Sequence, residues 1–534
     1  MAVLNKSKWK APFWGKSNDY STGRDPLGLQ TTSQASYSTL LPGITNLTNR
    51  IRYYGFYCWL LEVYAKEKGD TNPATQNRFI RRGEYQIALL MQLHERESIQ
   101  IPGSSFATNE IIREESKAKL DIKLGADIEK GKNTYWKYSS GAFGQYYSGA
   151  LQAIGLIIHR DDTPVFVCTT HEDKSIVTGT KLAEAFAKNI SDRSRGLFIK
   201  NIEEGYLNKS DSEKLYEEFS ITMIPYDTDE WKLYTKMLFS NDLPLFQNVD
   251  NQTFFRKETM TTVLSYINKN DTTDDWDYFI KDLYRRKGSD FLDNETDSSF
   301  GWYYYQLNEY WHFGAETVFW GVLETLSSKY FKVELTKFLN DFSDTFIEAL
   351  IKYDFIDDKF QPLGKVINNV EDIDIWELSE EILASIKARD ISKSLWQGFK
   401  MILAIYKQNE GEFEKLYSFA ALHGMERDGD CINGLRDFSN KLDEPIYNVV
   451  EKFILKNIIN RHLDVAYRKM GSGTKNTLKF SYENNLLKHV ETMTPVWTTP
   501  RIYAMYSFFE DLGYVNEENK ISEIGKQLIE GKYI

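Results

Sequence analysis

Arginines near the N-terminus are the first side chains in this sequence whose types and spacing suit a chemical task. Guanidinium groups bind phosphates and carboxylates through paired hydrogen bonds, and nearby hydroxyl groups add further donors. This pattern predicts an anion pocket. The alternative, which we favour, is that the arginines pair with Glu62 and Glu84 inside a helical core. The residues concerned are Arg50, Arg52, Arg78, Arg81 and Arg82, with the hydroxyls of Thr45 and Thr48.

A second basic group lies near the C-terminus. Residues 451–501 contain nine Lys or Arg against four Asp or Glu, whereas residues 1–60 contain seven against two. The whole chain has a formal net charge of −12, so the part between these basic ends is strongly acidic. Such a chain does not coat nucleic acid, although its basic ends suit local contact with an anion. The predicted nucleic-acid or anion-binding residues are Arg50, Arg52, Arg461, Arg468, Lys469, Lys475, Lys479 and Arg501.

Signals for catalysis or metal binding are weak throughout the sequence. No two of the seven histidines stand at metal-ligand spacing. Asp428 and Asp430 resemble only a fragment of a cation loop, and the run 471–475 (GSGTK) has the wrong spacing for a phosphate loop. Glu115 and Lys117 have nuclease-like spacing but lie in a polar stretch. We therefore predict a protein that is not an enzyme, with no catalytic residue, metal or cofactor.

Composition indicates a globular protein of several domains. The 534 residues are 42% apolar, which is enough for real cores. Three distant cysteines indicate a reducing compartment, and neither a signal peptide nor an apolar run of membrane-spanning length is evident. We therefore expect a cytoplasmic protein without a membrane partner.

Helical patterns dominate the elements that would position these side chains. We expect helices over about 50–64, 78–97, 143–154, 181–189, 444–469 and 500–512, and a run of helices over 205–420. Residues 1–40 read as loop, and residues 103–140 as a polar connector with a charged helix near 110–120. The aromatic stretch Trp302 to Leu326 could stack nucleic-acid bases, but aromatics at helical spacing are far more often core.

Two segments share an arrangement typical of winged-helix modules. Each has a helix, a glycine stop (Gly155 or Gly513), two short apolar runs, and a hydroxyl residue (Thr178 or Ser522) that caps the next helix. The helix before the first hairpin lacks Lys and Arg, so that module suits protein contact. The second has Arg501 and the upstream cations, so it could contact phosphate. The alternative is that both modules are purely structural.

These patterns predict a mainly α fold: a helical bundle with N-terminal and C-terminal winged-helix-like modules that carry small β-hairpins. We place an N-terminal helical and winged-helix-like domain at 1–204, a central helical domain at 205–440 and a C-terminal winged-helix-like domain at 441–534.

The most distinctive sequence runs from Arg24-Asp25-Pro26-Leu27-Gly28 through Pro42-Gly43-Ile44-Thr45 to Arg50-Ile51-Arg52-Tyr53-Tyr54. This N-terminal sequence resembles the opening of an uncharacterised group of bacterial proteins, with a domain of unknown function, found in phage-defence and restriction gene neighbourhoods. The resemblance covers about a tenth of the chain. It implies a bacterial antiviral defence context and supplies no catalytic residues.

Three functional hypotheses follow. The first is a non-catalytic accessory or scaffold subunit of a bacterial anti-phage defence complex, which bridges an ATPase or nuclease partner, with DNA as a further ligand. Winged-helix ends around a helical middle are the layout of subunits that clamp SMC-type ATPases, so that partner class is included. The second is a stand-alone winged-helix DNA-binding protein, whose affinity would fall steeply with salt. The third is an unrecognised nuclease.

Overall fold

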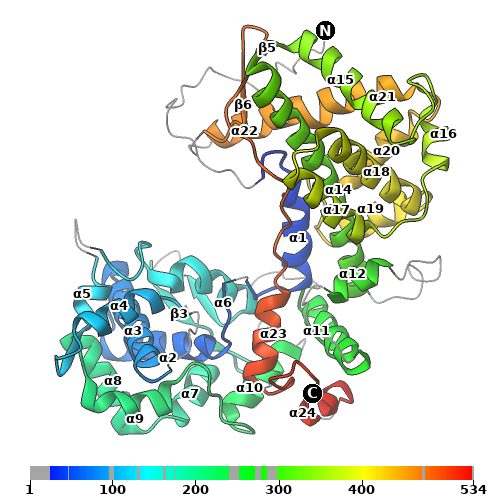
Figure 1. Cartoon of the computed structure of the whole chain (residues 1–534). Helices are drawn as coiled ribbons and strands as arrows, with labels where there is room; N and C mark the ends of the chain where they lie inside the picture. Colours follow the sequence, from blue (N-terminus) through cyan, green and yellow to red (C-terminus); the bar gives the residue numbers. More distant parts are fainter. Residues whose placement is uncertain are drawn as a thin grey trace. The chain divides into compact units, whose positions relative to one another are not determined.

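The chain is mainly helical, as predicted, with a few short antiparallel strands (Figure 1). The computed structural model describes residues 25–45, 47–95, 101–128, 133–159, 164–173, 175–239, 252–270, 278–285, 297–471 and 476–531. Within these residues, no helix has both the length and the apolar character needed to cross a lipid bilayer.

Two compact units make up the fold, and each combines segments that are far apart in the sequence. Unit 1 comprises the described residues within 1–36, 280–293 and 300–498. Unit 2 comprises those within 37–279, 294–299 and 499–534. The boundaries fall inside three helices, α1 (Gln30–Leu40), α12 (Tyr278–Arg285) and α14 (Asp297–Thr325), and before Thr499. The division into domains at 1–204, 205–440 and 441–534 stays a prediction.

Unit 2 contains most of the first half of the chain and its last helices. Its elements are α2 (Arg52–Glu67), α3 (Pro73–His94), α4 (Ser104–Arg113), β1 (Lys119–Asp121), α5 (Ile122–Ala126), the π-helical turn η2 (Phe143–Tyr147), α6 (Ser148–Ile154), β2 (Ile157–His159), β3 (Phe166–Cys168), α7 (Gly179–Lys188), α8 (Asp192–Glu204), β4 (Tyr206–Asn208), α9 (Lys209–Phe219), α10 (Asp229–Phe239), α11 (Gln252–Lys269), α23 (Ile502–Asp511) and α24 (Glu523–Ile529).

Helix α2 is the centre of unit 2. Every residue from Arg52 to Leu61 is buried, and α7, α3 and β3 pack against it. The helix is rich in aromatics and lacks proline, so it loses no backbone hydrogen bond and supplies large apolar surfaces on all sides. Rings from distant elements meet there, as when Trp59 contacts Phe198 and Phe219. The sequence-based prediction of a buried helix in this place is confirmed.

Unit 1 is a helical bundle with one small sheet. Besides parts of α1 and α12 and most of α14, its elements are the π-helical turn η3 (Leu326–Tyr330), β5 (Lys332–Glu334), α15 (Leu335–Lys352), α16 (Leu363–Asn368), α17 (Ile375–Lys387), α18 (Ile391–Asn409), α19 (Phe413–Leu422), α20 (Cys431–Ser439), α21 (Ile446–Phe453), the π-helical turn η4 (Ile454–Asn460), α22 (Arg461–Gly471), β6 (Phe480–Glu483) and β7 (Leu486–His489).

Helix α14 forms the core of unit 1. Its residues from Phe300 to Thr325 are all buried, and Trp302, Trp311 and Trp320 are at most 3% exposed. Buried rings cannot stack on nucleic-acid bases, so the core interpretation of this aromatic stretch is confirmed. The antiparallel sheet has the order β5-β7-β6. Asn484 and Asn485 join β6 to β7, and both have positive φ, as a tight hairpin turn requires.

Two regions predicted to be irregular are ordered elements. Residues 30–40 form α1, although Thr, Ser and Tyr make this segment a poor helix former alone. Contacts at both of its ends, described below, compensate for that weakness. Within 103–140, expected to be a polar connector with a charged helix near 110–120, the helix α4 begins earlier and ends at Arg113, and β1 and α5 follow it. Strand β1 pairs with β4. Local propensity missed α1 and β1 because distant segments stabilise them.

Candidate functional site

The predicted basic residues are divided between the two units. Arg50, Arg52 and Arg501 belong to unit 2, whereas Arg461, Arg468, Lys469 and Lys479 belong to unit 1. Lys475 lies outside the described residues, as does most of the Gly/Ser run around it. The contacts of these side chains show what each cation does in the folded chain.

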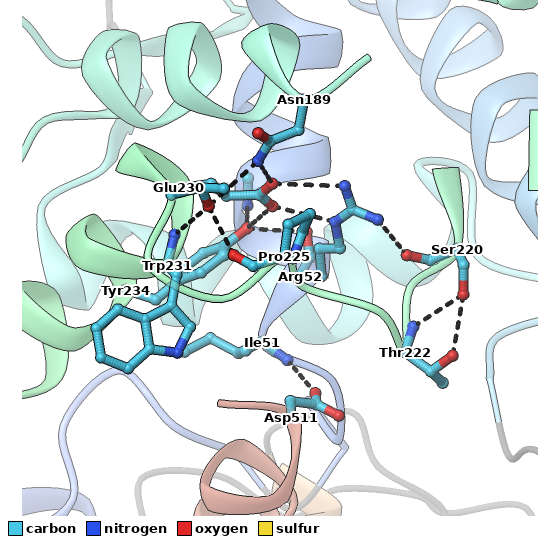
Figure 2. A network of polar contacts seen from close by, with 12 residues as sticks. Ile51, Arg52, Asn189, Ser220, Thr222, Pro225, Glu230, Trp231, Tyr234 and Asp511 are labelled. Carbon is cyan, nitrogen blue, oxygen red and sulfur yellow. Dashed lines mark hydrogen bonds and ion pairs between the residues drawn. The ribbon is translucent and has the colours of Figure 1, made fainter. Parts of the chain in front are cut away.

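Arg52 is the hub of a buried polar network in unit 2 (Figure 2). Its side chain is 2% exposed, and its Nε and Nη2 atoms donate to the Glu230 carboxylate at 3.1 and 3.4 Å. Its Nη1 donates to the Ser220 carbonyl at 2.5 Å. Glu230 also accepts hydrogen bonds from Asn189 at 2.6 Å and from the Tyr234 hydroxyl at 3.1 Å. The guanidinium therefore joins the start of α2 to the end of α9 and the start of α10.

Arg50 makes a second ion pair just before α2. Its Nη1 lies 2.6 Å from Oδ1 of Asp511, and the other oxygen of Asp511 accepts the Ile51 N–H at 3.1 Å. The end of α23 thus supplies a carboxylate to the N-terminus of α2, where the helix dipole favours a negative charge. Burial raises the pKa of Asp511 to about 7, against the lowering effect of Arg50.

Arg501 binds the end of α1 together with Arg256. Arg501 donates to the Leu41 carbonyl at 3.0 Å and to the Ser38 hydroxyl at 2.8 Å, and Arg256 donates to the Pro42 carbonyl at 3.0 Å. The two flanking carbonyls also accept hydrogen bonds: the Thr259 hydroxyl donates to the Leu40 carbonyl, and the Tyr54 hydroxyl donates to the Gly43 carbonyl. Four successive carbonyls, from the last residue of α1 to Gly43, are therefore satisfied by side chains, as a buried helix end requires. The Leu-Pro-Gly part of the distinctive N-terminal sequence is this turn.

The cations of α22 bind the Asp25–Gly28 segment in the same manner. Lys469 donates to the Asp25 carbonyl at 2.5 Å, and Arg461 donates to the carbonyls of Leu27 at 2.5 Å and Gly28 at 3.3 Å. The ring nitrogen Nδ1 of His462 lies 3.0 Å from the Pro26 carbonyl. Burial lowers the pKa of His462 to about 3, so the ring is neutral and donates from Nδ1. The cations at the C-terminal end of unit 1 thus hold its N-terminal segment.

The two other predicted cations of unit 1 also have carboxylate partners. Lys479 is buried and its Nζ lies 2.5 Å from Glu491. Arg468 contacts Asp464 at 3.1 Å and Asp428 at 3.3 Å, but its side chain is 49% exposed. Of the predicted cations within the described ranges, Arg468 is the most accessible to an external phosphate.

Two of the three arginines of α3, Arg81 and Arg82, are likewise used inside unit 2, with partners other than those expected, whereas Arg78 is exposed. Arg81 donates to the carbonyls of Ala126, Tyr138 and Trp136, and Arg82 pairs with Asp127 at 2.5 Å. The core interpretation is therefore confirmed for Arg81 and Arg82. Their expected pairing with Glu62 and Glu84 is wrong, because Glu62 accepts the Thr180 hydroxyl at 3.0 Å and pairs with Lys66 at 3.5 Å, and Glu84 has neutral donors.

Glu84 instead accepts hydrogen bonds from neutral groups. The donors are the hydroxyls of Tyr57, at 2.8 Å, and Tyr135, and the backbone N–H groups of Ala142, at 3.0 Å, and Phe143. Burial raises the pKa of Glu84 above its usual value, although these donors oppose the shift. The carboxylate holds the segment before α6 against α3.

The first predicted hairpin module is present in unit 2. Helix α6 ends at Gly155, which has φ of 82°, and β2 pairs antiparallel with β3. Thr169 donates its hydroxyl to the Gly155 carbonyl at 2.7 Å and its N–H to the Leu156 carbonyl at 2.9 Å. Thr178 then caps α7 by accepting the Lys181 N–H. The predicted glycine stop, hairpin and hydroxyl cap are confirmed.

The second module repeats these contacts near the C-terminus. Helix α23 is followed by Gly513, with φ of 73°, and a bridge between Val515 and Ile521 closes the hairpin. Ser522 donates its hydroxyl to the Gly513 carbonyl at 2.6 Å and its N–H to the Tyr514 carbonyl at 2.9 Å, and it caps α24. In the first module Thr169 binds the glycine carbonyl and Thr178 caps the next helix, whereas in the second module Ser522 does both.

A glycine in the helix after each hairpin completes the correspondence, and sequence reasoning missed it. A Cβ on Gly179 would lie 2.0 Å from the Leu156 carbonyl oxygen, and one on Gly525 would lie 2.4 Å from that of Tyr514. Each glycine lets its helix pack directly on the strand backbone. The signal that could have revealed this packing is a glycine within three residues after the capping hydroxyl, Gly179 after Thr178 and Gly525 after Ser522.

Helix α14 carries a buried acidic and histidine cluster that sequence reasoning also missed. His312 Nε2 lies 3.0 Å from Glu316, and Nδ1 lies 3.9 Å from Glu309. The two glutamates also accept the N–H groups of Val496, at 3.2 Å, and Thr498, at 2.8 Å. Burial alone would lower the pKa of His312, but the two carboxylates outweigh it and raise the pKa to about 9. Three ionisable residues at i, i+3 and i+7 in the middle of a helix rich in aromatic and apolar residues were the signal.

The weaker catalytic signals have structural contacts where they can be traced. Asp430 caps α20 and accepts the Tyr304 hydroxyl at 2.6 Å, and Lys117 pairs with Glu114. In the described part of the chain, no group of three or more His, Cys, Asp or Glu side chains is arranged to hold a metal ion.

An acidic cleft of about 740 Å³ opens in unit 1. Its two basic side chains are engaged: Arg285 lies 2.7 Å from Asp374, and Lys407 donates to the carbonyls of Asn368 and Val370. Four further carboxylates line the cleft, those of Glu371, Asp372, Glu410 and Glu412. Such a wall disfavours phosphate.

Comparison of the chain with protein-family models, curated proteins and solved structures found no match.

Proposed function

We propose that this chain is a non-catalytic accessory or scaffold subunit of a bacterial anti-phage defence complex. In this role it bridges an ATPase, SMC-type ATPases included, or a nuclease partner. The observation that carries the proposal is the pair of helix–glycine–hairpin–helix modules, at Gly155 and Gly513, with matching backbone contacts. We assign both to the winged-helix-like class, whose members either read DNA or hold proteins. The defence context comes from the resemblance of the N-terminal sequence.

The first module favours a protein partner. The run formed by η2 and α6 contains no Lys or Arg. Its exposed side consists of Gln145, Gly149 and Ala153, and the half-buried residues beside them are Gly144, Tyr146 and Gln152. This small, uncharged face, which we call the α6 face, lets another backbone approach closely and offers nothing to neutralise a phosphate.

The contacts of the basic residues support the same choice. Arg52, Arg461, Lys469 and Arg501 each donate to backbone carbonyls within their own unit. Binding a phosphate would require each of them to give up these contacts. DNA binding by the chain alone would therefore depend on cations such as Arg468.

Co-expression with the neighbouring genes tests the proposal. We expect the tagged chain to co-purify with an ATPase or nuclease encoded beside it. Gly149→Arg, which fills the α6 face with a long cation, should reduce recovery at least tenfold. Gly196→Arg is the matched control, because Gly196 is also an exposed helical glycine with no atom within 4 Å of an added Cβ. Absence of any complex, or equal loss in both variants, would contradict the proposal.

Two measurements on the purified chain separate the alternatives. A stand-alone DNA-binding protein would bind duplex DNA with an affinity that falls steeply with salt and weakens in Arg468→Glu. A nuclease would cleave DNA when a divalent metal is added. Either result in the isolated chain, without a partner, would replace the scaffold proposal.

A further inference from the structure

Two of the chain's three cysteines lie against each other in unit 2, although 110 positions separate them. Cys58 is in α2 and Cys168 is in β3, and these two elements pack together. The Cys168 thiol donates to the carbonyl oxygen of Cys58 with Sγ and O 3.3 Å apart, which places its sulfur against the residue Cys58. We propose that Cys58 and Cys168 form a reversible disulfide when the protein meets a two-electron oxidant.

The two thiols differ in access, which sets the order of the reaction. Cys58 is 0% exposed, whereas Cys168 is half-buried at the edge of the hairpin. An oxidant therefore reaches Cys168 first. The hydrogen bond to Cys58, burial and the nearby Glu62 raise the pKa of Cys168 well above its usual value. Because the thiolate is the reacting form, oxidation should be slow at neutral pH and faster at higher pH.

The chemical step is a balanced two-electron oxidation. With diamide, the Cys168 thiolate adds to one nitrogen of the N=N bond. The Cys58 sulfur then attacks the Cys168 sulfur and expels the hydrazine. One S–S bond forms, two S–H bonds are lost, and two protons and two electrons pass to the former N=N group. In a cell, a peroxide would take the same two electrons and leave as water. A dithiol reductant reverses the reaction.

The disulfide would tie the β2–β3 hairpin to the central helix of unit 2. Cys168 lies beside the first turn of α7, since an added Cβ on Gly179 would be 3.0 Å from its Cβ atom. Oxidation would therefore restrain the first module at the junction of α2, β3 and α7. In a reducing compartment such a bond is transient, as expected of a redox-sensitive site rather than a structural one.

Thiol counting on the full chain tests the proposal directly. The reduced, denatured protein has three titratable thiols, one for each cysteine of the sequence. After diamide treatment of the folded protein we expect one, and peptide mapping should show residues 58 and 168 joined. Cys431→Ser is the matched control because Cys431, in unit 1, is also 0% exposed, and this variant should fall from two thiols to none. Cys168→Ser should keep both of its thiols.

A thermal measurement keeps the test decisive if one variant folds poorly. Oxidation should raise the Tm of unit 2 by roughly 5 °C in the wild type and in Cys431→Ser, reversibly with dithiothreitol. It should leave Cys168→Ala unchanged. Three remaining thiols after oxidation, a bond to Cys431, or disulfide-linked dimers in place of the internal bond would each overturn the proposal.

Discussion

Replacing Glu230 by Gln should destabilise unit 2 more than any comparable surface change. The carboxylate accepts four hydrogen bonds, two from Arg52, one from Asn189 and one from Tyr234. Glutamine keeps the shape but turns one oxygen into a donor. If the amide nitrogen lies beside Arg52 Nη2 and Asn189, two of the four contacts place a donor against a donor. If it lies beside Arg52 Nε and Tyr234, only the contact with Arg52 does so, because the Tyr234 hydroxyl can accept. At about 1.5–3 kcal/mol for each bond to a charged group, the loss is about 1.5–6 kcal/mol.

A second estimate gives a similar value. Removing one partner of a buried ion pair typically costs about 3–5 kcal/mol, because the remaining charge stays in a poorly polarisable environment. Here that charge is Arg52, which is 2% exposed and keeps as acceptors the Ser220 carbonyl and the one oxygen that the new amide retains. Replacing both partners by apolar residues of similar size, Arg52→Met with Glu230→Leu, should therefore cost less than the sum of the single changes.

Urea unfolding followed by circular dichroism measures the loss, and hydrogen exchange of peptides from α2 and α10 shows whether it lies in unit 2. The matched control is Asp229→Asn at the adjacent position. Asp229 pairs with Lys188 at 2.8 Å, but the two side chains are 62% and 68% exposed, so solvent screens the pair and we expect almost no change. A loss below about 1 kcal/mol for Glu230→Gln, or one no greater than that of Asp229→Asn, would refute the reasoning.

Three further changes test single contacts. Gly513→Ala places a side chain at φ of 73° and should lower the free energy of unfolding in urea by about 1–2 kcal/mol. Gly196→Ala in α8 should be neutral or stabilising. Equal losses of stability in the two variants would contradict this. The pKa of Asp511 is raised from 3.8 to about 7, so between these pH values the folded chain keeps a proton on Asp511 that the unfolded chain has lost. The stability of the wild type relative to Asp511→Asn should therefore fall from pH 5 to 7, by at most about 1.4 kcal/mol per pH unit. A difference that stays constant over that range would mean that Arg50 keeps Asp511 ionised in the folded chain. The pKa of His312 is raised from 6.5 to about 9, so its charged form should stabilise unit 1 by up to about 3 kcal/mol below pH 6.5. The stability advantage of the wild type over His312→Gln should vanish by pH 10. A difference in stability between the two proteins that does not change with pH would contradict this.

The hairpin modules show how far local sequence carried the prediction. A glycine after an apolar helix and a hydroxyl before the next one act over a few residues, so Gly155 and Ser522 could be assigned roles from the sequence. The partner atoms could not. That Thr169 binds the Gly155 carbonyl, and that Gly179 packs on the strand, depend on how the hairpin folds back.

The basic residues show where prediction from sequence ends. Charge and spacing identified Arg52, Arg461 and Arg501 as unusual, and each does bind an acceptor. The acceptors are Glu230, the Leu27 carbonyl and the Leu41 carbonyl, from 178 to 460 positions away. A side chain's charge is a property of its type, but its partner is chosen by the packing of distant segments.

The sequence by itself determined the mainly helical character of this protein, the buried aromatic helices α2 and α14, and the glycine-stopped hairpins, because helix propensity, apolar patterning and backbone sterics act locally. Only the tertiary structure decided that α1 is a helix, that the C-terminal cations hold the N-terminal segment of each unit, and that Cys58 meets Cys168. These outcomes depend on contacts between residues far apart in the chain, whose energies no local pattern contains.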